Sequence, residues 1–124
     1  MFCGAFDSMS PDRDDLEVTS FSSVPNDLIE EVRKVADSKG LPMLRSAYEE
    51  AIVQLCDDLE GGLKIDLWPS SRPGMAKAKE TVRLHNDISK RMREMVKRQN
   101  IRKGVFFRVA LARWLTRHGV DYNL

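Results

Sequence analysis

The sequence predicts a mainly α-helical protein with one two-stranded antiparallel ribbon. A strand-helix-helix pattern occurs at about 16–60 and again at about 79–119, and the apolar positions of the first helix recur at a shift of 60. One strand alone would leave its backbone groups unpaired, so we expect the two strands to pair across the four helices. The predicted order is β-α-α-linker-β-α-α, folded as one intertwined domain in which a monomer acts as its own dimer.

The first copy of the pattern begins with "LEVTSFSSVP", which is rich in Val, Thr, Phe and Ser and is stopped by Pro25. Asn26-Asp27 then marks the start of a helix, and Gly40 ends it. A second helix is expected from about Leu44 to Leu59. The first unit therefore spans residues 16–60.

The second copy begins with "KETVRLH", in which Val82 and Leu84 alternate with polar residues, as in a strand with one buried face. Asn86-Asp87 starts the third helix, and Asn100 takes the place of Gly40 at its end. The last helix is expected from about Lys103 to His118, so that the second unit spans 79–119.

Three other segments complete the predicted organisation. Residues 1–15 are interpreted as a flexible arm, 61–78 as a linker with turn-forming "SSRPG", and 120–124 as a tail. Trp68 in the linker either packs on the body or is only tethered to it.

Charge is distributed unevenly along the chain. Residues 1–60 carry 14 acidic and 5 basic side chains, whereas residues 61–124 carry 5 acidic and 15 basic ones. The basic half suggests a polyanionic partner. The alternative is that the two halves complement each other in charge.

Composition and motifs exclude several classes of protein. No apolar run approaches the roughly 20 residues of a membrane span, and no signal peptide is recognisable, so we expect a cytoplasmic protein without membrane contact. Cys3 and Cys56 have no metal-ligand spacing, and no nucleophile-base pattern occurs. We therefore expect no enzyme, no catalytic residue, no metal and no cofactor.

The stretch "VPNDLIEEVRKVADSKG" and the matching pattern "RLHNDISKRMREMVKRQNI" resemble the ribbon-helix-helix family of Arc and MetJ repressors. The resemblance covers about 17–59 and 79–118. The tandem single-chain form is similar in architecture to the TraY-like proteins of conjugative plasmids and to the border-binding accessory proteins of T-DNA transfer. The resemblance implies a protein that binds double-stranded DNA by placing its ribbon in the major groove.

The resemblance also implies which strand residues read bases. In the second strand they are Lys79, Thr81 and Arg83, whose side chains can bond guanine or meet a thymine edge. The corresponding residues of the first strand, at a shift of 60, are Thr19, Phe21 and Ser23. Phe21 either contacts a thymine methyl or packs into the core, because the alternation in "VTSFSSV" is poor.

In the family, the start of the second helix of each unit grips the phosphate backbone. The residues at that place are Arg102, Lys103 and Gly104 in the second unit, with Arg45 and Ser46 as the weaker counterpart in the first. Free amides and the helix dipole favour anions there. A solvated helix start is the structural alternative.

The resemblance implies two biological uses, an accessory factor in conjugative or T-DNA transfer and a transcriptional repressor, with other DNA-processing or regulatory proteins as further partners. The alternative of another class is a protein-interaction module, antitoxin-like or a scaffold, with weak or no specific DNA binding. Salt dependence separates the two, because phosphate binding weakens steeply with added salt.

Overall fold

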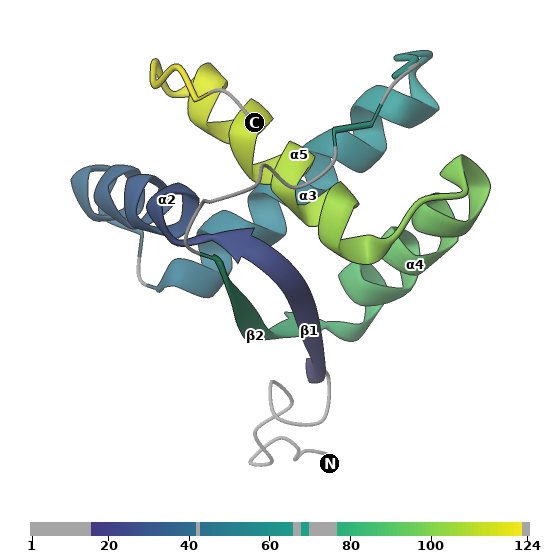
Figure 1. Cartoon of the computed structure of the whole chain (residues 1–124), viewed down its shortest axis with the longest axis horizontal. Helices are drawn as coiled ribbons and strands as arrows, with labels where there is room; N and C mark the ends of the chain where they lie inside the picture. Colours follow the sequence, from purple (N-terminus) through teal and green to yellow (C-terminus); the bar gives the residue numbers. More distant parts are fainter. Residues whose placement is uncertain (1–15, 42, 66–67, 70–76, 123–124) are drawn as a thin grey trace, which may run out of the picture.

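The structure is a computed structural model that describes residues 16–41, 43–65, 68–69 and 77–122. The expected arm at 1–15, Cys3 within it, and much of the expected linker lie outside these ranges. Within them the chain forms four helices and one two-stranded antiparallel sheet, which confirms the mainly helical class. In chain order the elements are β1 (Leu16–Pro25), α2 (Asn26–Ser38), α3 (Leu44–Glu60), β2 (Lys77–His85), α4 (Asn86–Gln99) and α5 (Lys103–Arg117) (Figure 1).

The helices that follow the strands begin and end in the same way. Asn26 is the first residue of α2 and Asn86 the first of α4, and each is followed by an aspartate in the first turn, where a carboxylate favours the helix dipole. After the helices, Gly40 has a φ of 72° and Asn100 a φ of 55°. Asparagine tolerates this left-handed conformation better than most residues, which explains how Asn100 can stand in for a glycine.

The two strands pair antiparallel, although they lie about 60 residues apart in the chain. Leu16 lies opposite His85 at one end of the ribbon, and Ser20 lies opposite Thr81 near its centre. The register is interrupted between Phe21 and Val24, where β1 contains a bulge. The pairing gives each strand the backbone partner that neither has alone.

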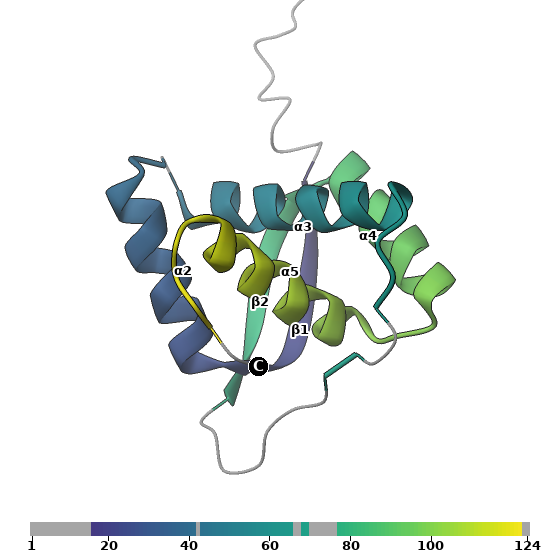
Figure 2. The same ribbon diagram turned by 90° about the horizontal axis from the view of Figure 1, so that it is seen from above.

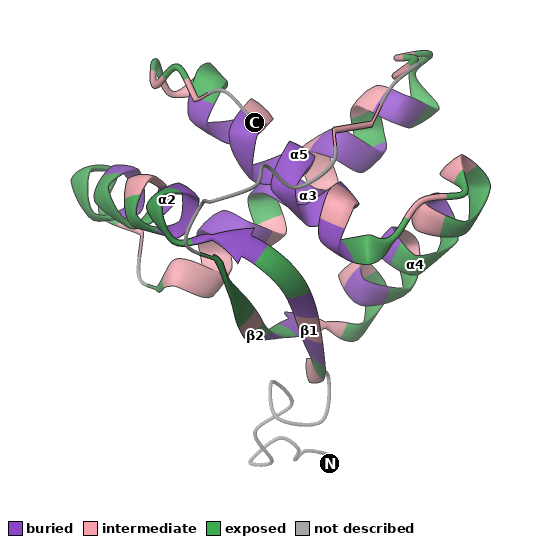
Figure 3. Ribbon diagram, in the orientation of Figure 1, coloured by how far each residue is buried: buried purple, intermediate pink, exposed green. Residues whose placement is uncertain are grey.

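The helices cover one face of the ribbon. Helices α3 and α5 lie over that face, with α2 and α4 on opposite sides of the molecule (Figure 2). No described helix lies over the other face of the ribbon. Burial follows this layering, with buried residues between the ribbon and the helices and exposed ones on the outside (Figure 3).

Both strands and all four helices contribute to one hydrophobic core. Its largest fully buried side chains include Trp114, Tyr48, Phe21, Phe106 and Phe107. The ring of Phe21 stacks on that of Phe107, with centroids 3.9 Å apart, and Tyr48 meets Phe107 edge-on at 5.1 Å. Aromatic pairs of this kind contribute about 0.5–1.5 kcal/mol beyond their buried area, so Phe21 fastens the first strand to α5, and Tyr48 joins α3 to the same ring of Phe107.

The described part of the linker packs on this core. Leu63, Ile65 and Trp68 are partly buried against it, and the Trp68 ring lies 6.5 Å from that of Phe106. Of the two alternatives for Trp68, packing on the body is therefore correct. Beyond α5 the chain returns to α2, where the Tyr122 hydroxyl donates to Oδ1 of Asp27 at 2.6 Å.

Candidate nucleic-acid interface

The face of the ribbon that no described helix covers, here called the outer face, carries three polar side chains from β2. Lys79, Thr81 and Arg83 are exposed, whereas Val82 and Leu84 between and beyond them are buried in the core. The predicted assignment of faces in this strand is therefore confirmed. The regular alternation of the sequence is sufficient to place these residues, because successive side chains of a strand point to opposite faces.

The outer face of β1 is made by residues other than the predicted ones. Thr19 is only 8% exposed, so the prediction that it faces outward is wrong. Phe21 is fully buried, so of its two alternatives packing into the core is correct. Ser23 is exposed but lies in the bulge, with a φ of 58°. In β1, the side chains that alternate with the buried ones, and so form its part of the outer face, are those of Val18, Ser20 and Ser22.

The bulge explains this difference between the strands. Phe21 and Val24 are three residues apart and both are buried, although a regular strand would place them on opposite faces. An extra residue at Ser22-Ser23 restores the inward direction of Val24. It also changes which residues of the two strands are equivalent. Upstream of the bulge, a residue of β1 corresponds to the residue of β2 that is 61 positions later in the chain, and not 60. The spacing of Phe21 and Val24 is the sequence signal that could have revealed it.

The outer face consists of three cross-strand rows. Val18 lies opposite Arg83 at one end, and in the middle the hydroxyl oxygens of Ser20 and Thr81 lie 3.1 Å apart. At the other end, the bulged pair Ser22-Ser23 faces Lys79, because Phe21 pairs with Glu80 and Val24 with Ala78. Each end of the outer face therefore carries one cation, and both cations come from β2.

The start of α5 lies against β1. Lys103 Nζ donates to Oγ1 of Thr19 at 3.0 Å and lies 5.9 Å from the centre of the Phe21 ring. Gly104 is buried, and a Cβ at this position would come within 3.0 Å of the Ser22 carbonyl oxygen. A glycine thus lets the helix approach the bulge closely, because a Cβ here would require the Ser22 backbone to shift by a few tenths of an ångström. Of the predicted phosphate-contact residues, Gly104 consequently has a packing role that sequence reasoning did not foresee.

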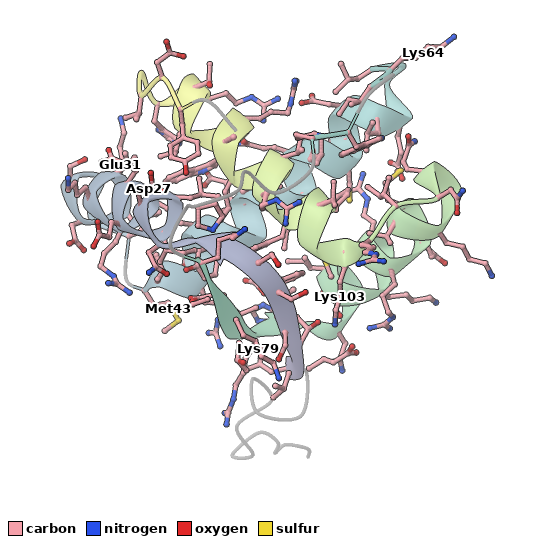
Figure 4. The ribbon with its side chains drawn as sticks, viewed as in Figure 1. Asp27, Glu31, Met43, Lys64, Lys79 and Lys103 are labelled. Carbon is pink, nitrogen blue, oxygen red and sulfur yellow. The ribbon has the colours of Figure 1, made fainter. Side chains whose placement is uncertain are left out.

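Electrostatics at the start of α5 favour an anion. The helix has no side-chain cap and no acidic residue in its first turn. The positive end of its dipole is therefore not neutralised by side chains of the helix itself. Arg102 and Lys103 are exposed beside it. Lys103 and Lys79 lie on the ribbon side of the molecule, far from Lys64 at the opposite end (Figure 4).

The start of α3 lies against β2 and has a different character. The Tyr48 hydroxyl donates to Oε2 of Glu80 at 2.9 Å, which ties this helix to the strand. Arg45 and Ser46, the predicted counterparts in the first unit, are half-buried. The N-cap residue Met43 is 46% exposed. This helix start therefore presents an apolar side chain where α5 presents two cations.

Ion pairs within the described residues join the acidic first half to the basic second half. Arg91 pairs with Asp57 and Glu60, Arg93 with Glu17, and both Arg113 and Arg117 with Asp58. Burial acts to raise the pKa of Asp58, but hydrogen bonds from the two arginines outweigh it and lower that pKa. No ion pair joins Lys79 or Arg83 to another described residue, so the outer face keeps its positive charge. The two interpretations of the charge asymmetry are therefore compatible with each other.

The described part of the chain also bears on metal, membrane and thiol chemistry. No group of three or more His, Cys, Asp and Glu side chains there could hold a metal ion. None of its helices has the length and apolar character required to cross a bilayer. Cys56 is buried, and burial raises the pKa of its thiol to about 11, so the thiol stays protonated at neutral pH.

Comparison with protein-family models, with curated proteins and with solved structures found no match to this chain. The functional conclusion therefore rests on the outer face and on the two helix starts beside it.

Proposed function

We propose that this chain is a sequence-specific DNA-binding protein that inserts its β1–β2 ribbon into the major groove of double-stranded DNA. The observation that supports this most strongly is the outer face, on which the exposed side chains of Lys79, Thr81 and Arg83 alternate with residues that point toward the core. Paired strands lie about 4.8 Å apart, and the major groove is about 12 Å wide, so that a two-stranded ribbon with its side chains fits. The lysine and the arginine would then reach base edges.

The helix starts would contact the DNA backbone on either side of the ribbon. The α5 start lies beside β1 and the α3 start beside β2, so each would face one of the two phosphate strands that border the groove. Arg102 and Lys103 supply charge at the first, together with free helix amides. Such contacts hold a protein in register on DNA, while base contacts supply specificity.

We also propose that the two strand-helix-helix segments form a tandem ribbon-helix-helix pseudo-dimer within one chain. The strands pair about the Ser20–Thr81 row, with the Val18–Arg83 row on one side and the Ser22-Ser23 and Lys79 row on the other, as expected for an approximate two-fold axis. Helices α2 and α4 also share their first residue and their left-handed ends. A pseudo-dimer of unlike halves can recognise a site that is not a palindrome, whereas a symmetric dimer favours palindromes.

Two biological uses fit this biochemical function. One is an accessory factor that marks an origin or border in conjugative or T-DNA transfer, which the tandem form favours. The other is a transcriptional repressor at an operator. Identifying the preferred DNA sequence, and locating it in the genome of the source organism, would distinguish an origin of transfer from a promoter.

The direct test is selection from a random duplex library, with sequencing of the retained DNA and measurement of affinity at several salt concentrations. We expect an enriched motif and an affinity that falls steeply as salt rises. Arg83→Ala should weaken binding to that motif by about 1–3 kcal/mol and relax one position. Arg98→Ala, which removes an exposed arginine from α4, is the matched control and should retain the motif.

Uniform, salt-sensitive binding without a motif in all three proteins would contradict sequence-specific readout. Absence of DNA binding would favour the protein-interaction module instead, and its partner would then be sought among proteins.

A further inference from the structure

We infer that the outer face reads a directional DNA site, in which the end formed by Val18 and Arg83 specifies a thymine close to a guanine and the opposite end specifies less. This inference rests on the proposed insertion of the ribbon into the major groove. It assigns a base class to each end of the ribbon and a role to Val18.

Val18 is an apolar side chain on an otherwise polar surface. It is 60% exposed, whereas Phe21, Val24, Val82 and Leu84 of the ribbon are buried and Leu16 is half-buried. Among the groups that a base pair shows in the major groove, the C5 methyl of thymine is the apolar one. A β-branched aliphatic side chain on the outer face therefore matches thymine better than any other base.

Arg83 lies directly opposite Val18 in the ribbon register. Opposed residues of an antiparallel pair have Cα atoms about 4.5–5.5 Å apart, and successive base pairs are about 3.4 Å apart. The two side chains would thus meet the same or neighbouring base pairs. The guanidinium fork of arginine can bond O6 and N7 of guanine together, which is the commonest specific contact in this groove.

The remainder of the outer face is less selective. At the centre, the hydroxyl groups of Ser20 and Thr81 lie 3.1 Å apart and bond each other, which occupies part of their hydrogen-bonding capacity. At the far end Lys79 is a point charge without a planar fork, and Ser22 can donate to or accept from any base edge. Selectivity should therefore decline along the ribbon from Val18 and Arg83 toward Ser22 and Lys79.

The first experiment identifies the DNA site, and the second removes one chemical group at a time from its bases. After library selection, we would measure binding to duplexes in which the specified thymine is replaced by deoxyuridine, or the specified guanine by 7-deazaguanine. The first change removes only the C5 methyl group, and we expect about a four-fold loss of affinity for the wild-type protein. The second removes the N7 acceptor, and we expect a loss of about ten-fold.

Matched variants assign each loss to a side chain. Val18→Ser removes both methyl groups of this exposed side chain, and should abolish the response to deoxyuridine while leaving the response to 7-deazaguanine. Arg83→Ala, which removes every donor of this side chain, should show the reverse. The double variant Ser22→Val/Lys79→Arg gives both ends the same chemistry, and the selected motif should then become more nearly palindromic. Thermal unfolding of each variant checks that these exposed substitutions leave the fold intact.

The possible failures are distinguishable. A clear motif that is already palindromic, or a wild-type affinity unchanged by loss of the thymine methyl, would overturn the directional readout and leave the proposed function standing. Absence of any motif would overturn both.

Discussion

Helices α3 and α5 carry opposite charges at the same place, their sixth residue. In α3 this residue is Glu49, whose Oε2 accepts a hydrogen bond from the backbone amide of His85 at 2.7 Å and lies 2.7 Å from the ring Nδ1. In α5 it is Arg108, which is 5% exposed and donates to the carbonyl oxygens of Ser23 at 3.2 Å and Pro69 at 3.4 Å. Burial lowers the pKa of this guanidinium from its ordinary value.

The difference follows from what each strand offers. At the end of β2, His85 has an amide that needs an acceptor, whereas the corresponding residue of β1 is Pro25, which has none. In β1 the bulge instead leaves the Ser23 carbonyl to be satisfied by a donor. Each helix thus supplies a hydrogen-bond partner to the backbone of the strand from the other half of the chain. The acidic and basic copies are complementary parts, so that neither half could pair as well with a second copy of itself.

Reversing the charge of Arg108 should be the most damaging change. Arg108→Glu would place a carboxylate in a buried site against a carbonyl oxygen, and we expect the free energy of unfolding to fall by about 3 kcal/mol or more. Urea unfolding followed by circular dichroism would measure this. Arg102→Glu, on the exposed residue before α5, should change stability by less than about 0.5 kcal/mol.

Exchanging the charges of residues 49 and 108 tests whether the backbone groups that these side chains contact determine which charge each position needs. The double variant Glu49→Arg/Arg108→Glu should be at least as unstable as Arg108→Glu alone, because the amide of His85 would still need an acceptor. Recovery of wild-type stability would mean that only charge balance between the helices matters.

Removing the acceptor at Glu49 should have an intermediate effect. Glu49→Ala leaves a partly buried amide without a partner, and we expect a loss of about 1–3 kcal/mol in the free energy of unfolding. The matched control is Glu30→Ala on the exposed face of α2. Equal effects of the two changes would contradict a specific role for the carboxylate at the strand end.

The smallest expected effect concerns the far ends of the same two helices. Asp58 of α3 accepts hydrogen bonds from Arg113 and Arg117 of α5, and its pKa is lowered in the folded protein. A lowered carboxyl pKa contributes stability above the unfolded value of about 3.8, and that contribution is lost as the pH falls through the folded pKa. Asp58→Asn should therefore lose less stability than wild type between pH 7 and pH 3, measured as the shift in Tm.

The exposed Asp37→Asn in α2 is the control for this change. A pH dependence of Asp58→Asn identical to that of wild type would show that the pairing adds nothing to stability.

The sequence predicts some features of the molecule well and others poorly, for physical reasons. The four helices follow from the spacing of apolar residues, and the faces of β2 follow from strict alternation. In β1, one inserted residue reverses the faces upstream of it, so that a prediction by correspondence fails at Thr19 and Phe21. The partners of Glu49 and Arg108 depend on which backbone groups a distant strand leaves unsatisfied, and local periodicity carries no information about that.

Pairing between distant strands has a consequence for synthesis of the chain. Phe21 pairs with Glu80, which the ribosome adds 59 residues later, or roughly 3 to 12 s at ordinary rates of translation. During that interval the nascent first strand has no partner, although Phe21 and Val24 are destined for the core. Between and after them stand Ser22-Ser23 and Pro25, which interrupt the run of strand-forming residues. The residues that shape the finished ribbon therefore also limit self-association of an unfinished one.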